Sequence, residues 1–175
     1  MIVGDGSKNC RAGFGEPSRI ESFANGLIAA MKKLTRKQAT DISDPRFRIR
    51  MMRETVKKVH EHGELWLPLL NLIATFIDGL ASGKGREAKK AYLGYLKSNF
   101  PELCADLGAE VFYKNFRCAA VHEFGVRPPF ALWRDADLNG KYTGTVEVEG
   151  YEVTALNIDR LVKDFLDHLS KIEPK

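Results

Sequence analysis

The chain has 175 residues, of which 44% are hydrophobic and 29% charged, as expected for a single globular domain. Its formal net charge of +4 permits an anionic partner such as RNA but does not require one. The three cysteines, Cys10, Cys104 and Cys118, are too far apart in sequence for a metal knuckle or a redox pair, so we expect reduced thiols and a cytoplasmic protein.

The first residues contain no basic region followed by an apolar core, so they do not resemble a signal peptide. The most apolar stretch, residues 65–77, contains Pro68 and Asn71 and is too short to cross a bilayer. We therefore expect no membrane association and a buried helix in this stretch.

The N-terminal third predicts a tail and two helices. Residues 1–16 are rich in glycine and indicate a flexible tail. Ser18 has the spacing of a capping box with Glu21, and apolar residues follow at helical spacing. Asp44-Pro45 predicts a second helix that continues to about His60. We expect residues 17–62 to form a helical pair that packs on the rest of the chain.

Four further helical segments are predicted before the character of the sequence changes. They are a nearly all-apolar helix over about 64–80, a helix over 86–98, a short turn over 102–107 and a helix over 109–123. The first has apolar side chains around most of its circumference, which is typical of a central helix.

The last fifty residues predict a small β element and a final helix. Residues 130–133 can form a short strand, and Asn139-Gly140 is a strong turn signal. Thr143–Val148 and Tyr151–Ala155 alternate as the strands of a hairpin. Asn157 can cap the final helix. The predicted fold is mainly α, a helical bundle over 63–175 with a β-hairpin insert at about 130–155 before the C-terminal helix.

The segment from Tyr113 to Phe124, Y-K-N-F-R-C-A-A-V-H-E-F, places Arg117 and His122 late in a helix with four residues between them. This pattern resembles the HEPN superfamily, which carries R-x4-6-H near the end of a helix, often preceded by an aromatic residue and followed by glutamate. The resemblance covers about residues 64–172. It implies a HEPN-like bundle and a metal-independent endoribonuclease of the toxin or phage-defence type, without a cofactor.

Arginine suits RNA cleavage because its guanidinium can hold phosphate. Histidine suits it because an imidazole titrates near neutral pH and can act as a base or acid. Arg117 and His122 are five positions apart, so a regular helix places them about 140° apart, and one helix makes a poor complete site. The resemblance implies that two protomers pair their motif helices around a cleft. The expected partners are therefore a second copy, a homologous protein or a cognate antitoxin, and RNA.

Neighbouring residues complete the candidate site. Lys114, Asn115, Cys118 and Glu123 are candidate substrate-binding residues. Asp78, an acid within the apolar central helix, needs a partner, and Arg117 is one candidate, which gives Asp78 a structural or supporting role. No metal ligands are expected, since His60 and His62 lack a third ligand nearby.

Alternative interpretations remain open for the same residues. His122 can be a histidine that only contacts the last carbonyls of its helix, and Arg117 can form a surface ion pair with Glu123 or Glu110. Cys118 stands where active family members usually carry a polar residue, which favours a second hypothesis, a non-catalytic HEPN-like module that binds RNA, a nucleotide or a protein. A third hypothesis is a helical interaction protein in which the motif is chance.

Overall fold

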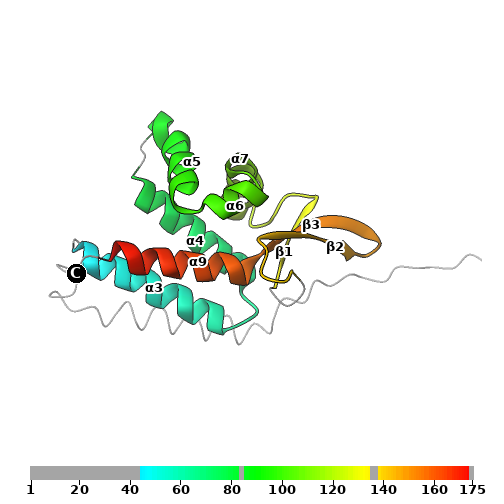
Figure 1. Ribbon diagram of the computed structural model, residues 1–175, viewed down its shortest axis with the longest axis horizontal. Coiled ribbons are helices and arrows are strands. Elements are labelled where there is room, and N and C mark those ends of the chain that lie inside the picture. The colour runs from blue at the N-terminus through cyan, green and yellow to red at the C-terminus, as the bar shows by residue number, and fades with distance from the viewer. Residues whose placement is uncertain (1–43, 83–84, 135–137, 174–175) are drawn as a thin grey trace, which may run out of the picture. The chain divides into compact units, whose positions relative to one another are not determined.

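A computed structural model describes residues 44–82, 85–134 and 138–173. The tail expected over 1–16 and the helix expected from Ser18 lie outside the described residues. The part described here belongs to one compact unit, Pro45–Lys175, which is mainly helical and carries a small sheet (Figure 1). The expected fold class is confirmed at this level.

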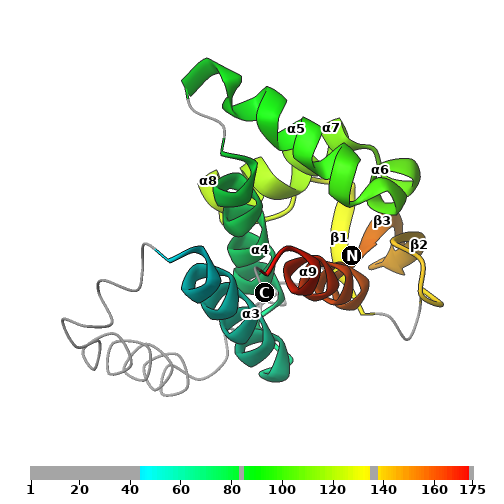
Figure 2. The ribbon, with the colours of Figure 1, turned by 60° about the vertical axis from the view of Figure 1, so that its left-hand side comes forward.

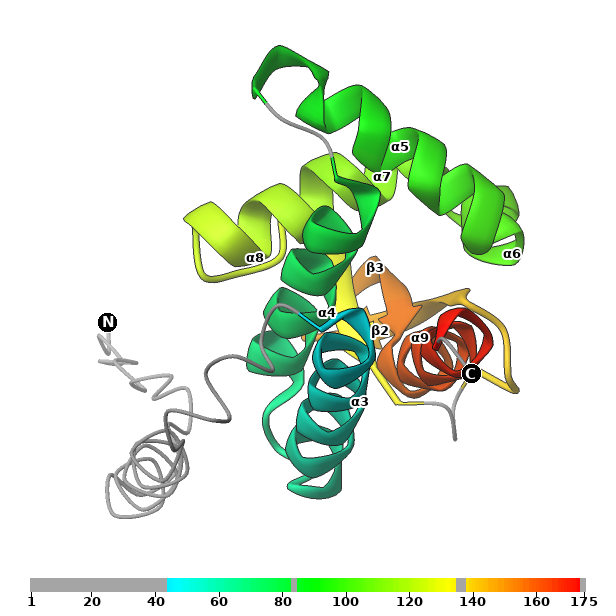
Figure 3. The ribbon, with the colours of Figure 1, turned by 90° about the vertical axis from the view of Figure 1, so that its left-hand side faces the viewer.

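Helices α3 (Pro45–Glu61) and α4 (Trp66–Ala81) form a hairpin whose members lie side by side in Figure 3. The first helix ends near His60 as predicted, and Gly63 follows it: its φ is +71° and its amide bonds the His60 carbonyl at 3.0 Å. Helix α3 also packs along the C-terminal helix, α9 (Ile158–Ile172), so it belongs to the same compact unit as the bundle.

Helix α4 is central because α3, α9, the next helix along the chain and the segment 112–122 all contact it. A 3₁₀ turn, Gly85–Glu87, leads into α5 (Ala88–Asn99), and Pro101 starts the short α6 (Pro101–Asp106) (Figure 2). The buried side chains of α4 are Leu69, Leu70, Ile73, Ala74 and Ile77.

The motif helix is continuous from Ala109 to His122 but irregular in its middle. It consists of α7 (Ala109–Val111), the π-helical segment η2 (Phe112–Arg117) and α8 (Cys118–His122). The predicted extent of this helix is confirmed, whereas its wider π-helical turn was not predicted. Such turns are rare and occur often at functional sites.

The sheet has three strands in the order β1-β3-β2. Strands β2 (Thr143–Val148) and β3 (Tyr151–Asn157) form the predicted antiparallel hairpin around the turn Glu149-Gly150. Strand β1 (Phe130–Trp133) pairs parallel to β3, with Ala131 opposite Ala155. The hairpin prediction is confirmed, and the parallel third strand extends it into a mixed sheet.

Asn157 joins the sheet to helix α9 (Ile158–Ile172). Its side-chain oxygen accepts a bond from the Arg160 amide at 2.9 Å, which confirms the predicted cap. Its side-chain nitrogen donates to the Lys141 carbonyl at 2.8 Å, and its own amide bonds the Tyr142 carbonyl at 2.9 Å. The residue is fully buried, so one side chain links the β2 entry, the β3 end and the start of α9.

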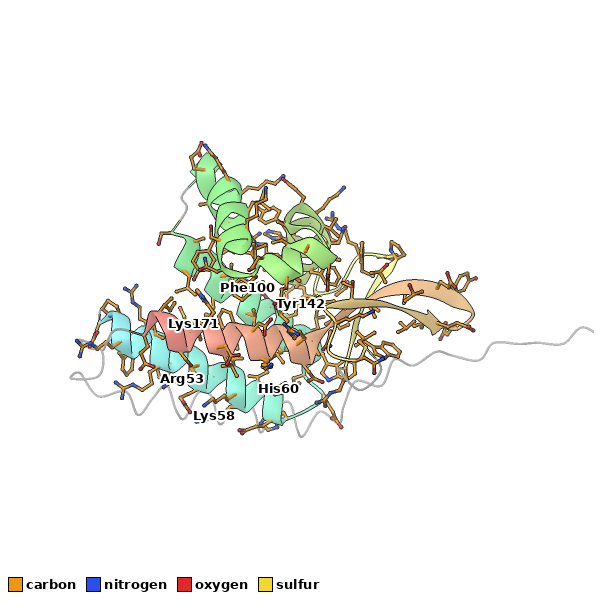
Figure 4. The ribbon with its side chains drawn as sticks, in the orientation of Figure 1. Arg53, Lys58, His60, Phe100, Tyr142 and Lys171 are labelled. Carbon is orange, nitrogen blue, oxygen red and sulfur yellow. The ribbon has the colours of Figure 1, made fainter. Side chains whose placement is uncertain are left out.

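Two polar contacts fix α3 against α9. Arg53 Nη1 donates to a Glu173 carboxylate oxygen at 2.6 Å, and His60 Nε2 lies 2.7 Å from Asp159 Oδ1 (Figure 4). Helix α9 is strongly amphipathic, and its buried residues include Leu161, Phe165 and Leu169. None of the helices in the described ranges is both long and apolar enough to span a membrane.

Candidate functional site

Three side chains meet where helix α4, which carries Asp78, packs on the motif helix, in which Arg117 ends η2 and His122 ends α8. Arg117 Nε and Nη2 donate to the same oxygen of Asp78, Oδ2, at 3.0 and 2.5 Å. Arg117 Nη1 lies 3.4 Å from His122 Nε2. The guanidinium therefore has an acid on one side and an imidazole on the other.

Asp78 fixes the orientation of the guanidinium. The side chain of Arg117 is 17% exposed and that of Asp78 is 30% exposed. Burial by itself lowers the pKa of Arg117, but the hydrogen bond and charge of Asp78 outweigh that effect and raise the pKa. The Tyr113 ring also lies 5.4 Å from the guanidinium carbon, in cation–π contact. The arginine is thus held charged and oriented before any ligand arrives.

His122 is exposed on the surface, at the last position of α8. Since a guanidinium can only donate, its contact with Nε2 requires the histidine tautomer whose Nε2 carries no proton. The expected separation of about 140° around the helix concerned the backbone positions only. The long side chain of Arg117 nevertheless reaches His122. The expectation that one helix keeps the two groups apart is therefore wrong.

The other expected site residues have varied surroundings. Lys114 is exposed, and the Asn115 carbonyl accepts a bond from the Arg127 amide at 3.2 Å. The Cys118 thiol lies 3.8 Å from Arg117 Nη1, close to the motif pair. Glu123 pairs with Arg127, whose Nε lies 3.1 Å from each of its carboxylate oxygens.

These contacts decide between the ion pairs considered for Arg117. Glu123 is engaged by Arg127, and Glu110 accepts from Lys89 at 2.7 Å. The hydrogen bond from Arg127 lowers the pKa of Glu123. The surface ion pair of Arg117 with Glu123 or Glu110 is therefore wrong, and Asp78 is the partner of the arginine.

Two tyrosines beside the motif were not identified from the sequence as site residues. Tyr113 contacts the Arg117 guanidinium, and its ring meets that of Tyr92 edge-to-face with centroids 5.3 Å apart. Tyr92 is fully buried, its hydroxyl has no hydrogen-bond partner within the described residues, and burial raises its pKa well above the ordinary value. The signal for Tyr113 was its place four residues before the arginine.

The helix predicted over 109–123 ends at His122, and a left-handed turn follows it. The residue with left-handed backbone is Phe124, with a φ of +51°, and its side chain is the most exposed large hydrophobic one described, at 78%. The Gly125 amide bonds the Ala119 carbonyl at 3.3 Å. A phenylalanine thus occupies the position that usually carries glycine.

A second polar cluster lines a cavity of about 240 Å³ where α6 meets α9, beside Phe100 and Tyr142 (Figure 4). Arg160 donates to Asp164 at 2.9 Å, to Glu102 at 2.6 Å and to the Gly140 carbonyl at 3.0 Å. The buried Tyr142 hydroxyl also donates to Asp164, at 2.6 Å. No motif residue lines this cavity.

Comparisons with models of known protein families, with curated proteins and with solved structures find no match to this chain. Within the ranges that the structure describes, no group of three metal-ligating side chains is close enough to hold an ion. The functional argument therefore depends on the geometry around Arg117 and on the resemblance of its motif.

Proposed function

We propose that this chain is a HEPN-like endoribonuclease that cleaves RNA without a metal, with Arg117 and His122 as its catalytic residues. The observation that carries the proposal is the contact between these two side chains, 3.4 Å apart, with the imidazole exposed and the guanidinium anchored by Asp78. The sequence motif supplies the family resemblance, and the contact supplies a chemical arrangement that suits it.

The anchored arginine suits phosphate binding in the transition state. Asp78 occupies Nε and Nη2 through a single oxygen, which leaves Nη1 facing His122. A phosphate oxygen that replaces the imidazole as the partner of Nη1 would lie against a fixed positive charge. Because Asp78 fixes the guanidinium beforehand, little reorganisation is needed when the phosphate gains charge.

His122 suits proton transfer to and from the ribose. The tautomer that faces Arg117 has an unprotonated Nε2, which is the form that a general base requires. Once phosphate binds Arg117, that nitrogen is free to take the proton of the ribose 2′-OH. The attack of the 2′-oxygen on phosphorus releases the 5′-oxygen of the next nucleotide and leaves a 2′,3′-cyclic phosphate. A protonated histidine, from this protomer or its partner, returns a proton to the leaving oxygen.

The proposal includes a homodimer, or a pair with a homologous protein, in which two motif helices supply one cleft. Asp78 neutralises much of the charge of Arg117, so a single protomer offers phosphate little net positive charge. A second protomer would add its own Arg117 Nη1 as a further phosphate donor and a second His122 that can act as the acid. Sedimentation at micromolar concentration should therefore give a dimer, and a strictly monomeric protein contradicts this part of the proposal.

The decisive experiment incubates the purified full chain with single-stranded RNA in EDTA. Wild-type protein should produce fragments with 2′,3′-cyclic phosphate ends, and His122→Ala should not. His62→Ala is the matched control because this histidine is also exposed but lies outside the motif. Equal cleavage by wild type and His122→Ala would show that the nuclease is a contaminant and remove the proposal.

A second candidate function is a non-catalytic module that binds RNA, a nucleotide or a protein such as an antitoxin through the same surface. Two observations favour it: the neutralising Asp78, and Cys118, a weak hydrogen-bond donor directly after the arginine. RNA binding that needs Arg117, without any cleavage, would identify this function. If Arg117→Ala and His122→Ala alter neither binding nor cleavage, the chain is a plain helical interaction protein.

A further inference from the structure

Phe124 combines backbone strain with exposure. Its φ of +51° lies in the left-handed region, where a side chain with a β-carbon is disfavoured and glycine is usual. Its side chain is 78% exposed, so burial of the ring does not offset that strain. Strained residues of this kind concentrate at binding and catalytic sites. The next residue is Gly125, yet the left-handed position of the turn is occupied by Phe124 and not by this glycine.

The surroundings of the ring favour a single flat ligand over a protein surface. The other exposed large hydrophobic side chains of the described residues lie on α3, at the β2–β3 turn and at the end of α9. Next to Phe124 the exposed side chains are His122 and Glu123, and further along Pro128 and Pro129. A stable protein interface needs a broad apolar centre, and one ring among polar groups does not provide it.

The segment that carries Phe124 is held in place. The Gly125 amide bonds the Ala119 carbonyl at 3.3 Å, and the Arg127 amide bonds the Asn115 carbonyl at 3.2 Å. Arg127 also pairs with Glu123 across the turn. These bonds fix the ring at the end of α8, two residues after His122, where the two Cα atoms are at most about 7 Å apart.

We infer that Phe124 is a stacking platform for an unpaired nucleobase of the RNA, next to the phosphate bound by Arg117 and His122. This inference rests on the proposed RNA substrate. Unstacked bases of single-stranded RNA bind aromatic side chains face to face, whereas bases inside a duplex are not accessible to such a ring. Phe124 therefore makes the site selective for single-stranded RNA and positions the nucleotide whose phosphate is attacked.

The test uses the full-length chain and fluorescent 2′-O-methyl RNA, which cannot be cleaved because the attacking hydroxyl is blocked. Phe124→Ala should weaken the affinity for the single strand about tenfold or more. Phe124→Trp should retain wild-type affinity, and the affinity of each variant for a matching duplex should be unchanged. Tyr151→Ala removes another exposed aromatic ring, 74% exposed, and should have no effect.

Binding and cleavage separate the inference from the proposed function. Loss of single-strand affinity in Phe124→Ala supports stacking even if unmodified RNA is never cleaved. Equal affinity of wild type and Phe124→Ala, or no binding by wild type, overturns the inference even if cleavage is found. A shift of the dimer–monomer equilibrium by Phe124→Ala, with RNA affinity unchanged, would instead assign the ring to a protein contact and also overturn it.

Discussion

Two arginines of the bundle are used differently. Arg160, beside the cavity between α6 and α9, spreads its donors over Asp164, Glu102 and the Gly140 carbonyl. Arg117 places two donors on a single oxygen of Asp78 and points its remaining group at an exposed imidazole. The first arginine holds three segments together, and the second keeps one side open to a ligand.

The comparison teaches that the distribution of an arginine's partners indicates its role better than its burial does. The side chains of Arg160 and Arg117 are 25% and 17% exposed, so both are partly buried. A defined cavity lies beside Arg160, yet this arginine already donates to Asp164, Glu102 and the Gly140 carbonyl. The more open chemistry is found at the end of α8.

The largest expected effect is a difference in the rate of RNA cleavage between variants of the two arginines. Arg117→Ala is expected to lower the rate of RNA cleavage about 10²- to 10³-fold, because it removes the fixed charge that faces the phosphate. Arg160→Ala should leave the rate of the folded protein unchanged. Single-turnover cleavage measured well below both melting temperatures tests this, and a folded Arg160→Ala variant without activity would reverse the assignment.

The next largest expected effect is a difference in unfolding free energy between variants of their acidic partners, Asp164 and Asp78. Asp164→Ala is expected to cost about 2 kcal/mol of unfolding free energy, since Tyr142, a residue only 2% exposed, would lose the acceptor of its hydroxyl. Asp78→Ala should cost about 1 kcal/mol or less, because water can reach this more exposed pair. Urea unfolding of both variants measures the difference, and an equal or inverted order would contradict the comparison.

A smaller, graded effect should appear with pH in the α6–α9 region. Burial, together with the positive charge of Lys171, lowers the pKa of His168, whose Nε2 hydrogen bonds the Tyr95 hydroxyl at 2.5 Å. Because the pKa of His168 is lowered in the folded protein, its neutral form contributes fully to stability above about pH 6.5. This contribution is lost as the pH falls below that value, since the unfolded chain then binds the proton more readily. His168→Gln should flatten the decline in stability between pH 7 and pH 5. An unchanged decline would assign it to other groups.

The smallest effect concerns the strained turn after α8. Phe124→Gly should raise the unfolding free energy by about 0.5 to 1 kcal/mol, because relief of left-handed strain exceeds the entropy cost of glycine. Asn139→Gly is the control, since Asn139 has the same φ of +51° but asparagine tolerates it well. Thermal unfolding compares the two. A loss of stability in Phe124→Gly would mean that the ring packs on the protein.

Local sequence signals predicted most of the secondary structure. The glycine at position 63 and the cap at Asn157 act over a few residues, so their effects could be derived without tertiary information. The parallel pairing of β1 with β3 was not predicted, because its partners are more than twenty residues apart and no local pattern specifies them.

The sequence named Arg117, His122 and Asp78 as candidate residues, but it did not predict their geometry. Helical periodicity gives the angle between Arg117 and His122 but not the reach of a flexible guanidinium. The unpartnered hydroxyl of Tyr92 depends on how α5 packs on the motif helix, which sequence spacing does not reveal. The left-handed backbone of Phe124 was not predicted, because glycine is the usual residue in that conformation.

Asn157 also determines where this chain can be engineered. The side-chain amide of Asn157 bonds both the Lys141 carbonyl before β2 and the Arg160 amide at the start of α9. Residues inserted beside Asn157 would therefore disrupt the connection between the sheet and α9. The turn at Glu149-Gly150 is exposed, and the ring of Tyr151 beside it is 74% exposed. A fluorophore or affinity tag therefore belongs at this turn, where it would leave the core of the protein intact.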